Sequence, residues 1–186
     1  MPSPVHRERL LPYVLKLDSR QPDAIDTVVI HCTELPDLET AWQYGERIMH
    51  PASGTGNSGH YYIDRDGRIE QWVPLDRAAH HVKDHNSNTI GIELVNLGRY
   101  PDWFDSNKQR MSEPYPDAQI DALQSLLGFL HTTLPGLRWI TGHEDMDTAM
   151  VAASDNPDLE VRRKLDPGIM FPWQRLLQHT DLERRV

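Results

Sequence analysis

The chain has little that would support covalent cross-linking or membrane insertion. Cys32 is the only cysteine among 186 residues, so no disulfide can form within the chain. This cysteine content fits a reducing compartment. No apolar run reaches the roughly 20 residues of a membrane-spanning helix, and residues 1–21 lack the continuous apolar segment of a secretory signal. We therefore expect a cytoplasmic protein, while export without a signal, to the periplasm or beyond, remains open.

Positive charge is also scarce. The 19 lysines and arginines are outnumbered by 28 aspartates and glutamates, which gives a formal net charge of −9. Proteins that follow nucleic-acid phosphates present a basic face, and anionic membranes attract basic surfaces. The composition thus argues against nucleic-acid and membrane partners. It leaves small or uncharged substrates open, and the ten histidines are numerous enough for their positions to matter.

Apolar spacing predicts one α/β domain at residues 26–186, preceded by an N-terminal extension at 1–25. Short β-branched or alternating runs predict strands, and two such runs around Asp66-Gly67 predict a hairpin. Apolar residues on one face and a capping Asp37 predict helices. The polar stretch 144–163 predicts loop with some helix. Strands are expected at 26–34, 61–73, 88–97 and 137–143, and helices at 37–49, 117–134 and 171–179. This order predicts a mixed central sheet flanked by helices on both faces.

Three residues at the ends of such elements could bind a metal ion. His31 ends the first strand, His143 follows Gly142 at the end of another, and Asp166 lies in the irregular "RRKLDPGIMFPW" segment. Each alone is more often a structural residue. Together, two imidazoles and one carboxylate form the ligand set of a catalytic zinc site with one position open. Ligands from separate strand ends are usual for sites in α/β sheets.

Two further residues could supply the chemistry of hydrolysis. In "TIGIELV", Ile90, Ile92 and Leu94 share one strand face, so Glu93 stands on the other beside small or apolar neighbours. A lone glutamate there needs a partner or a function, and it is a candidate general base. Lys164 lies two residues from Asp166 and could place positive charge where an oxyanion forms. Without their context, an edge-strand glutamate and a solvated lysine remain the simpler interpretations.

The motifs also resemble a known family. The segments "TVVIHCTE", "GHYYIDRDGRIEQWVPLDRAAHH", "NTIGIELVN", "ITGHEDM" and "RRKLDPGIMFPW" occur in the order found in zinc-dependent N-acetylmuramoyl-L-alanine amidases. The chain looks similar to their AmpD-like branch, which is related to phage amidase lysozymes and peptidoglycan recognition proteins. The resemblance covers roughly residues 26–177. It implies a peptidoglycan-recognition/amidase-like fold and hydrolysis of the bond between N-acetylmuramic acid and L-alanine.

The resemblance also implies roles for individual residues. His31, His143 and Asp166 would hold one Zn²⁺ per chain, Glu93 would act as the base, and Lys164 would assist at the carbonyl oxygen. Two further positions would shape the substrate pocket: His80 matches a pocket-wall histidine, and Asn88 matches a residue that helps to form the cleft. From the sequence itself, Trp103 in a polar loop is a candidate for stacking on a sugar or stem peptide. We expect a monomer whose partners are peptidoglycan fragments.

Four departures from the family pattern stand out. Gly59 occupies the position of a tyrosine in phage-type relatives, and Asp166 that of their cysteine. Residues 79–82 read "AHHV" where close relatives have "WHAG". The interval from His143 to Asp166 is long, so residues 147–163 could add a lid or groove wall. The sequence leaves the form of the substrate open between intact wall, soluble muropeptide and the 1,6-anhydro recycling product.

Other functions are also conceivable. A secreted or phage-type lytic amidase would cut the same bond in intact peptidoglycan. A non-catalytic peptidoglycan-binding module would have lost a metal ligand, whereas this chain keeps all three. His143, Asp145 and a later histidine such as His179 could form an iron facial triad, but that site would require a mostly-β fold, which the long helix expected at 117–134 does not support.

Overall fold

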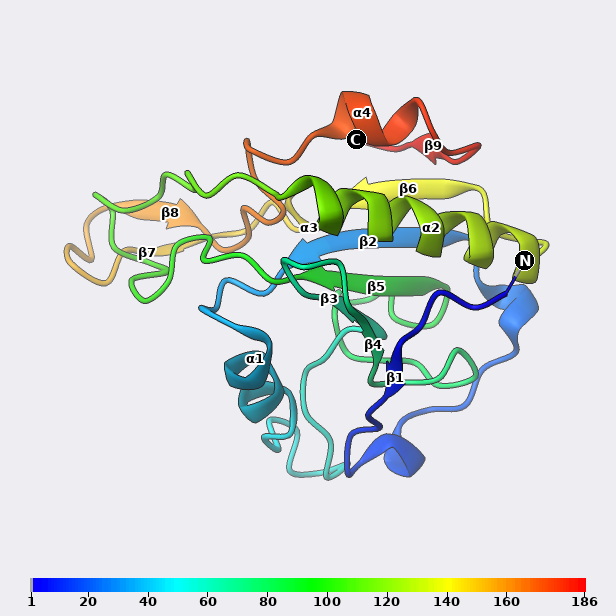
Figure 1. Cartoon of the computed structure of the whole chain (residues 1–186). Helices are drawn as coiled ribbons and strands as arrows, with labels where there is room; N and C mark the ends of the chain where they lie inside the picture. Colours follow the sequence, from blue (N-terminus) through cyan, green and yellow to red (C-terminus); the bar gives the residue numbers. More distant parts are fainter. Residues whose placement is uncertain (1) are drawn as a thin grey trace.

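The computed structural model describes residues 2–186 (Figure 1). A mixed sheet of seven strands, in the order β1-β4-β3-β5-β2-β6-β9, forms its centre. The hairpin predicted around Gly67 is present as the antiparallel pair β3 and β4, while β5, β2, β6 and β9 run parallel. The strands of this sheet are β1 (Arg7–Glu8), β2 (Thr27–Cys32), β3 (Tyr61–Ile63), β4 (Ile69–Gln71), β5 (Thr89–Leu94), β6 (Trp139–Gly142) and β9 (Glu183–Arg184).

The helices lie on both sides of this sheet, which confirms the predicted fold class (Figure 1). The Asp37 side chain accepts a hydrogen bond from the Thr40 amide and caps α1, as its position predicted. The helices are α1 (Leu38–Gly45), α2 (Asp117–Thr133), α3 (His143–Met146) and α4 (Trp173–Leu177), with 3₁₀ turns η1 (Val14–Lys16) and η2 (Pro22–Ala24). Within residues 2–186 no helix is both long and apolar enough to cross a bilayer.

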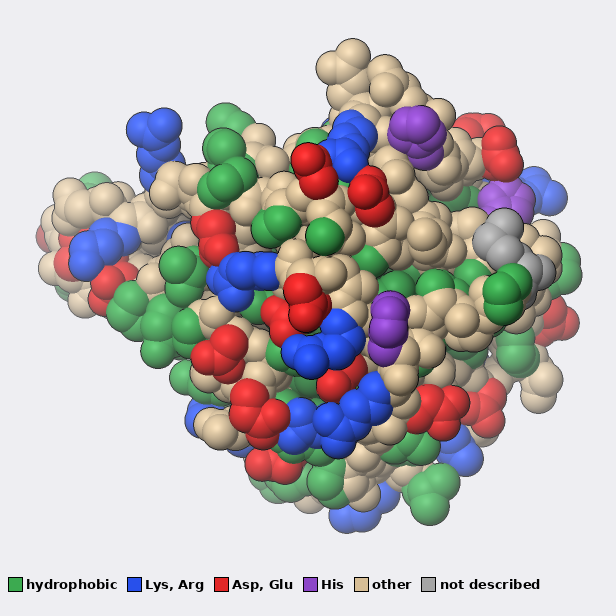
Figure 2. All heavy atoms as spheres, in the orientation of Figure 1, with side chains coloured by type: hydrophobic (Ala, Val, Ile, Leu, Met, Phe, Trp, Pro, Cys, Tyr) green, Lys and Arg blue, Asp and Glu red, His purple; other side chains and the backbone are tan. Residues whose placement is uncertain are grey.

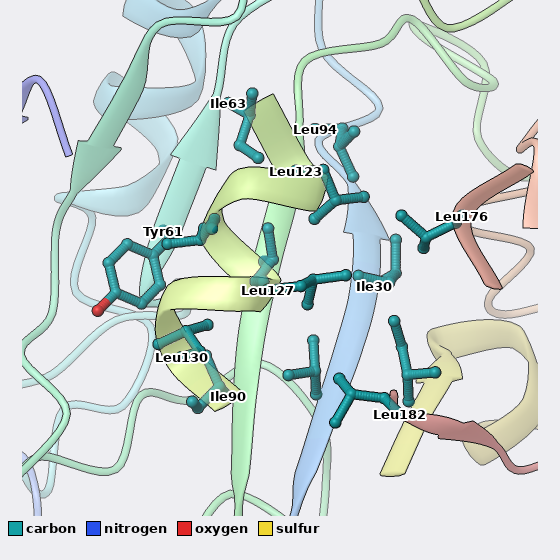
Figure 3. Close-up of a cluster of buried hydrophobic side chains, with 14 of the residues drawn as sticks. Ile30, Tyr61, Ile63, Ile90, Leu94, Leu123, Leu127, Leu130, Leu176 and Leu182 are labelled. Carbon is teal, nitrogen blue, oxygen red and sulfur yellow. The ribbon is translucent and has the colours of Figure 1, made fainter. Parts of the chain in front are cut away.

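One face of the sheet is closed by a large hydrophobic core. Leu123, Leu127 and Leu130 of α2 point toward Ile30 of β2 and Ile90 of β5 (Figure 3). All five side chains are fully buried, and each contributes about 1.5–3 kcal/mol of hydrophobic stabilisation. Outside this core, acidic and basic side chains are mixed over the face that carries α2, without a continuous basic patch (Figure 2).

The opposite face carries a smaller core and leaves room for a site. Leu38 and Ala41 of α1 pack with Trp72 and Val95 in this second cluster. The segment that the sequence sets apart as an N-terminal extension contributes to it as well, because Tyr13 and Leu17 are buried there. Strand β1 extends the sheet edge beside β4. Part of the segment 2–25 is therefore packed against the rest of the domain.

The segment 144–163 differs from its prediction of loop with some helix. The short α3 is present, but it is followed by a two-stranded antiparallel hairpin of β7 (Met150–Ala152) and β8 (Glu160–Arg162). This hairpin docks on the loop that contains Trp103: the Ser154 amide donates to the Phe104 carbonyl, and the Asp155 carboxylate accepts from Ser106. Its strands are largely exposed and have three residues each, which is too short for the alternation that signals a strand.

Candidate active site

Strand register places three polar side chains in one row on the open face of the sheet. His31 on β2 lies opposite Glu93 on β5, and Glu93 lies opposite Tyr62 on β3. Ile30 pairs with Gly142, so His143 follows immediately beside His31. Because side chains alternate along a strand, the neighbours Ile30 and Ile92 point into the α2 core instead. The parallel strands thus bring His31, Glu93 and His143 together at their carboxyl ends.

His31, His143 and Asp166 form a compact, buried group that could hold a metal ion. The His31 Nδ1, His143 Nδ1 and Asp166 Oδ2 atoms lie 3.0 Å from one another in all three pairs. Tetrahedral zinc with bonds of 2.0–2.2 Å keeps its ligand atoms about 3.3–3.5 Å apart. The triangle therefore fits a zinc ion after small side-chain shifts. The second carboxylate oxygen, Asp166 Oδ1, is buried without a hydrogen-bond donor, which also favours a cation here.

A chain of hydrogen bonds behind His31 fixes its tautomer. The Thr89 hydroxyl donates to the His85 carbonyl at 2.7 Å, so it must accept the hydrogen bond from His81 Nε2 at 3.1 Å. His81 Nδ1 is then an acceptor and receives the His31 Nε2–H at 3.0 Å. His31 Nδ1 consequently carries a lone pair that faces Asp166. Two acceptors in contact require a proton or a cation between them. A metal ion bound by both residues would be that cation.

This role of His81 was not predicted. The sequence indicated His80, one residue earlier in "AHHV", and assigned no role to His81. Asn86 fixes the loop that carries His81, because its side-chain oxygen accepts hydrogen bonds from the His81 and Val82 amides. The available signal was the departure itself: His81 stands within the segment where relatives read "WHAG".

The surroundings favour a neutral His31 and an ionised Asp166. Burial and the adjacent His143 together lower the pKa of His31 to about 4, against the opposing effect of Asp166. Burial pushes the pKa of Asp166 upward, but the neighbouring His143, His31 and Lys164 outweigh it and hold this pKa well below its usual value. Neutral imidazoles and a carboxylate are the protonation states in which these groups bind metal.

Glu93 stands beside this group in a confined position. Its Oε1 lies 4.0 Å from His31 Nδ1. Burial and the nearby Asp166 together raise the pKa of Glu93 to about 8, against the opposing effect of Lys164. A Cβ atom at Gly59 would lie only 2.8 Å from Glu93 Cγ. A tyrosine at this position, as in phage-type relatives, would therefore require Glu93 to move.

These groups line one cleft of about 890 Å³. His31, Glu93, His143 and Asp166 contribute to its lining, and Lys164 reaches it from the segment between β8 and α4. The α1 side and the loop around residue 103 provide further walls, and residues 147 and 163 at the base of the β7–β8 hairpin contribute too. The cleft therefore combines a strand-borne floor with a rim made of loops.

Two of the three residues expected to contact substrate line the cleft. His80 lines the cleft with its ring 4.8 Å from that of His50, and Trp103 lines it while its Nε1 donates to the Glu34 carbonyl. Asn88 does not join them. It lies ahead of β5, at the end opposite Glu93, and its side chain donates to Asp26. Five residues of extended strand separate the two positions by about 16 Å, so Asn88 is a structural residue here.

Comparisons with known proteins agree with this geometry. The family model described as N-acetylmuramoyl-L-alanine amidase matches residues 21–169. The chain is 29% identical over 178 residues to the 1,6-anhydro-N-acetylmuramyl-L-alanine amidase AmpD of Haemophilus influenzae, covering 84% of this chain and 83% of that protein. It is 26% identical over 149 residues to the endolysin of Escherichia phage T7, covering 80% and 90% of the two chains.

A solved structure has a similar fold. The amidase AmiD from E. coli, in complex with anhydro-N-acetylmuramic acid-L-Ala-D-γ-Glu-L-Lys, superposes with a TM-score of 0.64 at 26% identity, covering 84% of this chain and 57% of that one. The family match spans most of the chain and includes both histidines, Glu93, Lys164 and Asp166. The chain belongs to the N-acetylmuramoyl-L-alanine amidase family.

Proposed function

We propose that this amidase hydrolyses the bond between the lactyl group of N-acetylmuramic acid and L-alanine in soluble 1,6-anhydro-muropeptides, using one zinc ion. The observation that carries the proposal is the buried triangle of His31, His143 and Asp166 with Glu93 beside it on the cleft floor. Similarity to AmpD over most of both chains supports the choice of substrate. We also propose that the chain acts as a monomer in the cytoplasm, with residues 26–186 as the catalytic domain.

His31, His143 and Asp166 would hold the zinc through Nδ1, Nδ1 and Oδ2. When bound, zinc supplies a Lewis acid that makes a water molecule acidic and polarises the scissile carbonyl. Glu93 takes a proton from the attacking water and passes it to the leaving L-alanine nitrogen. Its raised pKa suits this exchange, although a cation nearby would lower it. Lys164 stabilises the negative charge that develops on the carbonyl oxygen.

A lytic amidase acting on intact wall is the second candidate. Similarity to the T7 endolysin over 90% of its length favours it. Purified protein should be assayed on 1,6-anhydro-muropeptide and on intact sacculi at matched bond concentration. We expect release of stem peptide from the soluble substrate and little from sacculi. Faster release from sacculi would replace the recycling function with wall lysis.

Metal dependence is tested in the same assay. Chelation should abolish activity, and stoichiometric zinc should restore it. The measured zinc content should be one per chain by elemental analysis. Full activity after complete removal of metal would overturn the zinc proposal while leaving the family assignment unchanged.

A further inference from the structure

Arg99 is a buried arginine whose guanidinium is fully used. It is 3% exposed. Its Nε and Nη2 donate to the two carboxylate oxygens of Glu34 at 2.7 and 2.9 Å. The remaining donors reach the Arg162 carbonyl at 2.9 Å, the Arg163 carbonyl at 3.1 Å and the Gln109 side chain at 3.1 Å. A planar fork with five N–H donors can make all these contacts at once, which an ammonium cannot.

These contacts join two parts of the site that are far apart in sequence. Glu34 comes three residues after His31 and lies just beyond the end of β2. Arg162 and Arg163 are the two residues directly before Lys164. Asp166 has separate anchors, because its carbonyl accepts from the Glu144 amide and the next carbonyl, of Pro167, accepts from the Tyr115 hydroxyl. Arg99 is thus placed to influence Lys164 more than the metal ligand.

The backbone around the ion pair is shaped for it. Glu34 has a φ of 50°, in the left-handed region, and Gly98 has a φ of 53°. A Cβ atom at Gly98 would lie 2.6 Å from Glu34 Cγ. A non-glycine residue with positive φ persists only where its surroundings hold it. Here the surroundings are the Arg99 fork and the Trp103 Nε1, which donates to the Glu34 carbonyl.

We propose that Arg99, held by Glu34, is a positioning residue that sets Lys164 relative to the scissile carbonyl. Its guanidinium donors are all used within the protein, so Arg99 acts through its neighbours. It fixes the two peptide groups ahead of Lys164 against the end of the strand that carries His31. A buried ion pair is weak support for stability by itself, whereas a fork that bridges a strand end and a loop determines geometry. The inference rests on the role proposed for Lys164 and adds how that residue is placed.

The test is a double-mutant cycle between Arg99→Lys and Lys164→Ala, measured as kcat and KM on 1,6-anhydro-muropeptide. Lysine keeps the charge and loses the fork. We expect Arg99→Lys to lower kcat about 10-fold with little change in KM or zinc affinity, since small misplacements of a catalytic group cost rate. In the Lys164→Ala background the same change should lower kcat less than about 2-fold.

Arg65→Lys is the matched control. Arg65 also forks onto a glutamate, Glu113, and donates to the Pro36 carbonyl, but it makes no contact with the segment before Lys164. It should lower stability without coupling to Lys164. Should Arg99→Lys fold poorly, Glu34→Gln provides a second variant. Glutamine keeps the shape of the Glu34 side chain and weakens its bonds with the Arg99 fork.

Equal losses of kcat from Arg99→Lys in both backgrounds would overturn the inference and leave Arg99 a purely structural residue. Unchanged kcat in Arg99→Lys would overturn it as well. If Lys164→Ala alone keeps full kcat, the proposed role of Lys164 fails and the inference fails with it. Zinc dependence and the need for Glu93 are measured separately, so failure of the proposed function as a whole would be recognised.

Discussion

The candidate active site consists of two halves that are held in different ways. His31 and Glu93 belong to adjacent parallel strands, and the backbone ladder of β2 and β5 fixes their register. Lys164 and Asp166 come from the irregular segment between β8 and α4, which is anchored by side chains and amides of other elements. A slip of one residue in the strand half would turn both side chains into the core. The loop half depends instead on individual anchoring contacts, so single substitutions outside the site can displace it.

The largest effect is expected from the loop half, where Asp166→Ala removes the one charged ligand. Zinc content should fall from one per chain to near zero, and activity should fall by roughly 10³-fold or more, because the Lewis acid is lost. Elemental analysis and the muropeptide assay measure both. Asp158→Ala, which replaces an exposed aspartate in the β7–β8 hairpin, is the control and should change neither. A zinc-loaded, active Asp166→Ala protein would show that the metal site lies elsewhere.

The strand half should separate chemistry from metal binding. Glu93→Gln keeps the size of the side chain and removes the base, so kcat should fall about 10²–10⁴-fold with zinc content unchanged. The exposed Glu46→Gln serves as a control. If the Glu93→Gln enzyme cleaves at the wild-type rate, Glu93 is not the base. Loss of zinc in this variant would instead make Glu93 part of the metal site.

Behind the strand half, the His81–Thr89 pair should influence zinc affinity more than chemistry. His81→Leu removes the acceptor for His31 Nε2–H, and zinc affinity should drop about 10–100-fold. Thr89→Val leaves His81 without its partner and should produce a smaller loss in the same direction. Chelator competition measures the zinc Kd without reference to activity. An unchanged Kd in both variants would mean that the ligand triangle alone orients His31.

The division into a strand half and a loop half also explains which parts of the site could be predicted from sequence. The β-branched run of β2 and the alternation in β5 identified the central strands, and a lone histidine or glutamate on an apolar strand is conspicuous. The β7–β8 hairpin was missed because each strand has only three residues, too few to show an apolar period. Asn88 was misplaced because proximity in sequence says nothing about which end of a strand meets the site.

Contacts between distant segments were outside the reach of sequence patterns. Arg99 and Glu34 are 65 residues apart, and His31 and His81 are 50 apart. Neither pair has a local signature, because each depends on the order in which the strands assemble. Residue chemistry made Asp166 a candidate ligand beside two strand-end histidines and Lys164 a candidate beside Asp166, but only the motif shared with a family tied them to one reaction. The loop half of this site thus gained its specific roles from homology, whereas the strand half followed from periodicity and residue chemistry.

The smallest effect is expected at the rim, and it would distinguish substrate binding from placement of the loop half. Trp103 lines the cleft, and its Nε1 donates to the Glu34 carbonyl at 3.1 Å. Trp103→Ala should raise KM about 3–10-fold with kcat nearly constant if the indole provides a surface for the sugar or peptide, because that contact stabilises bound substrate and transition state equally. Trp103→Phe keeps an aromatic face and loses only the N–H. Because the Arg99 fork still holds Glu34, both constants should stay within about 2-fold of wild type. A fall in kcat for Trp103→Phe, with KM unchanged, would instead show that the indole acts by holding Glu34, and through it Arg99 and Lys164.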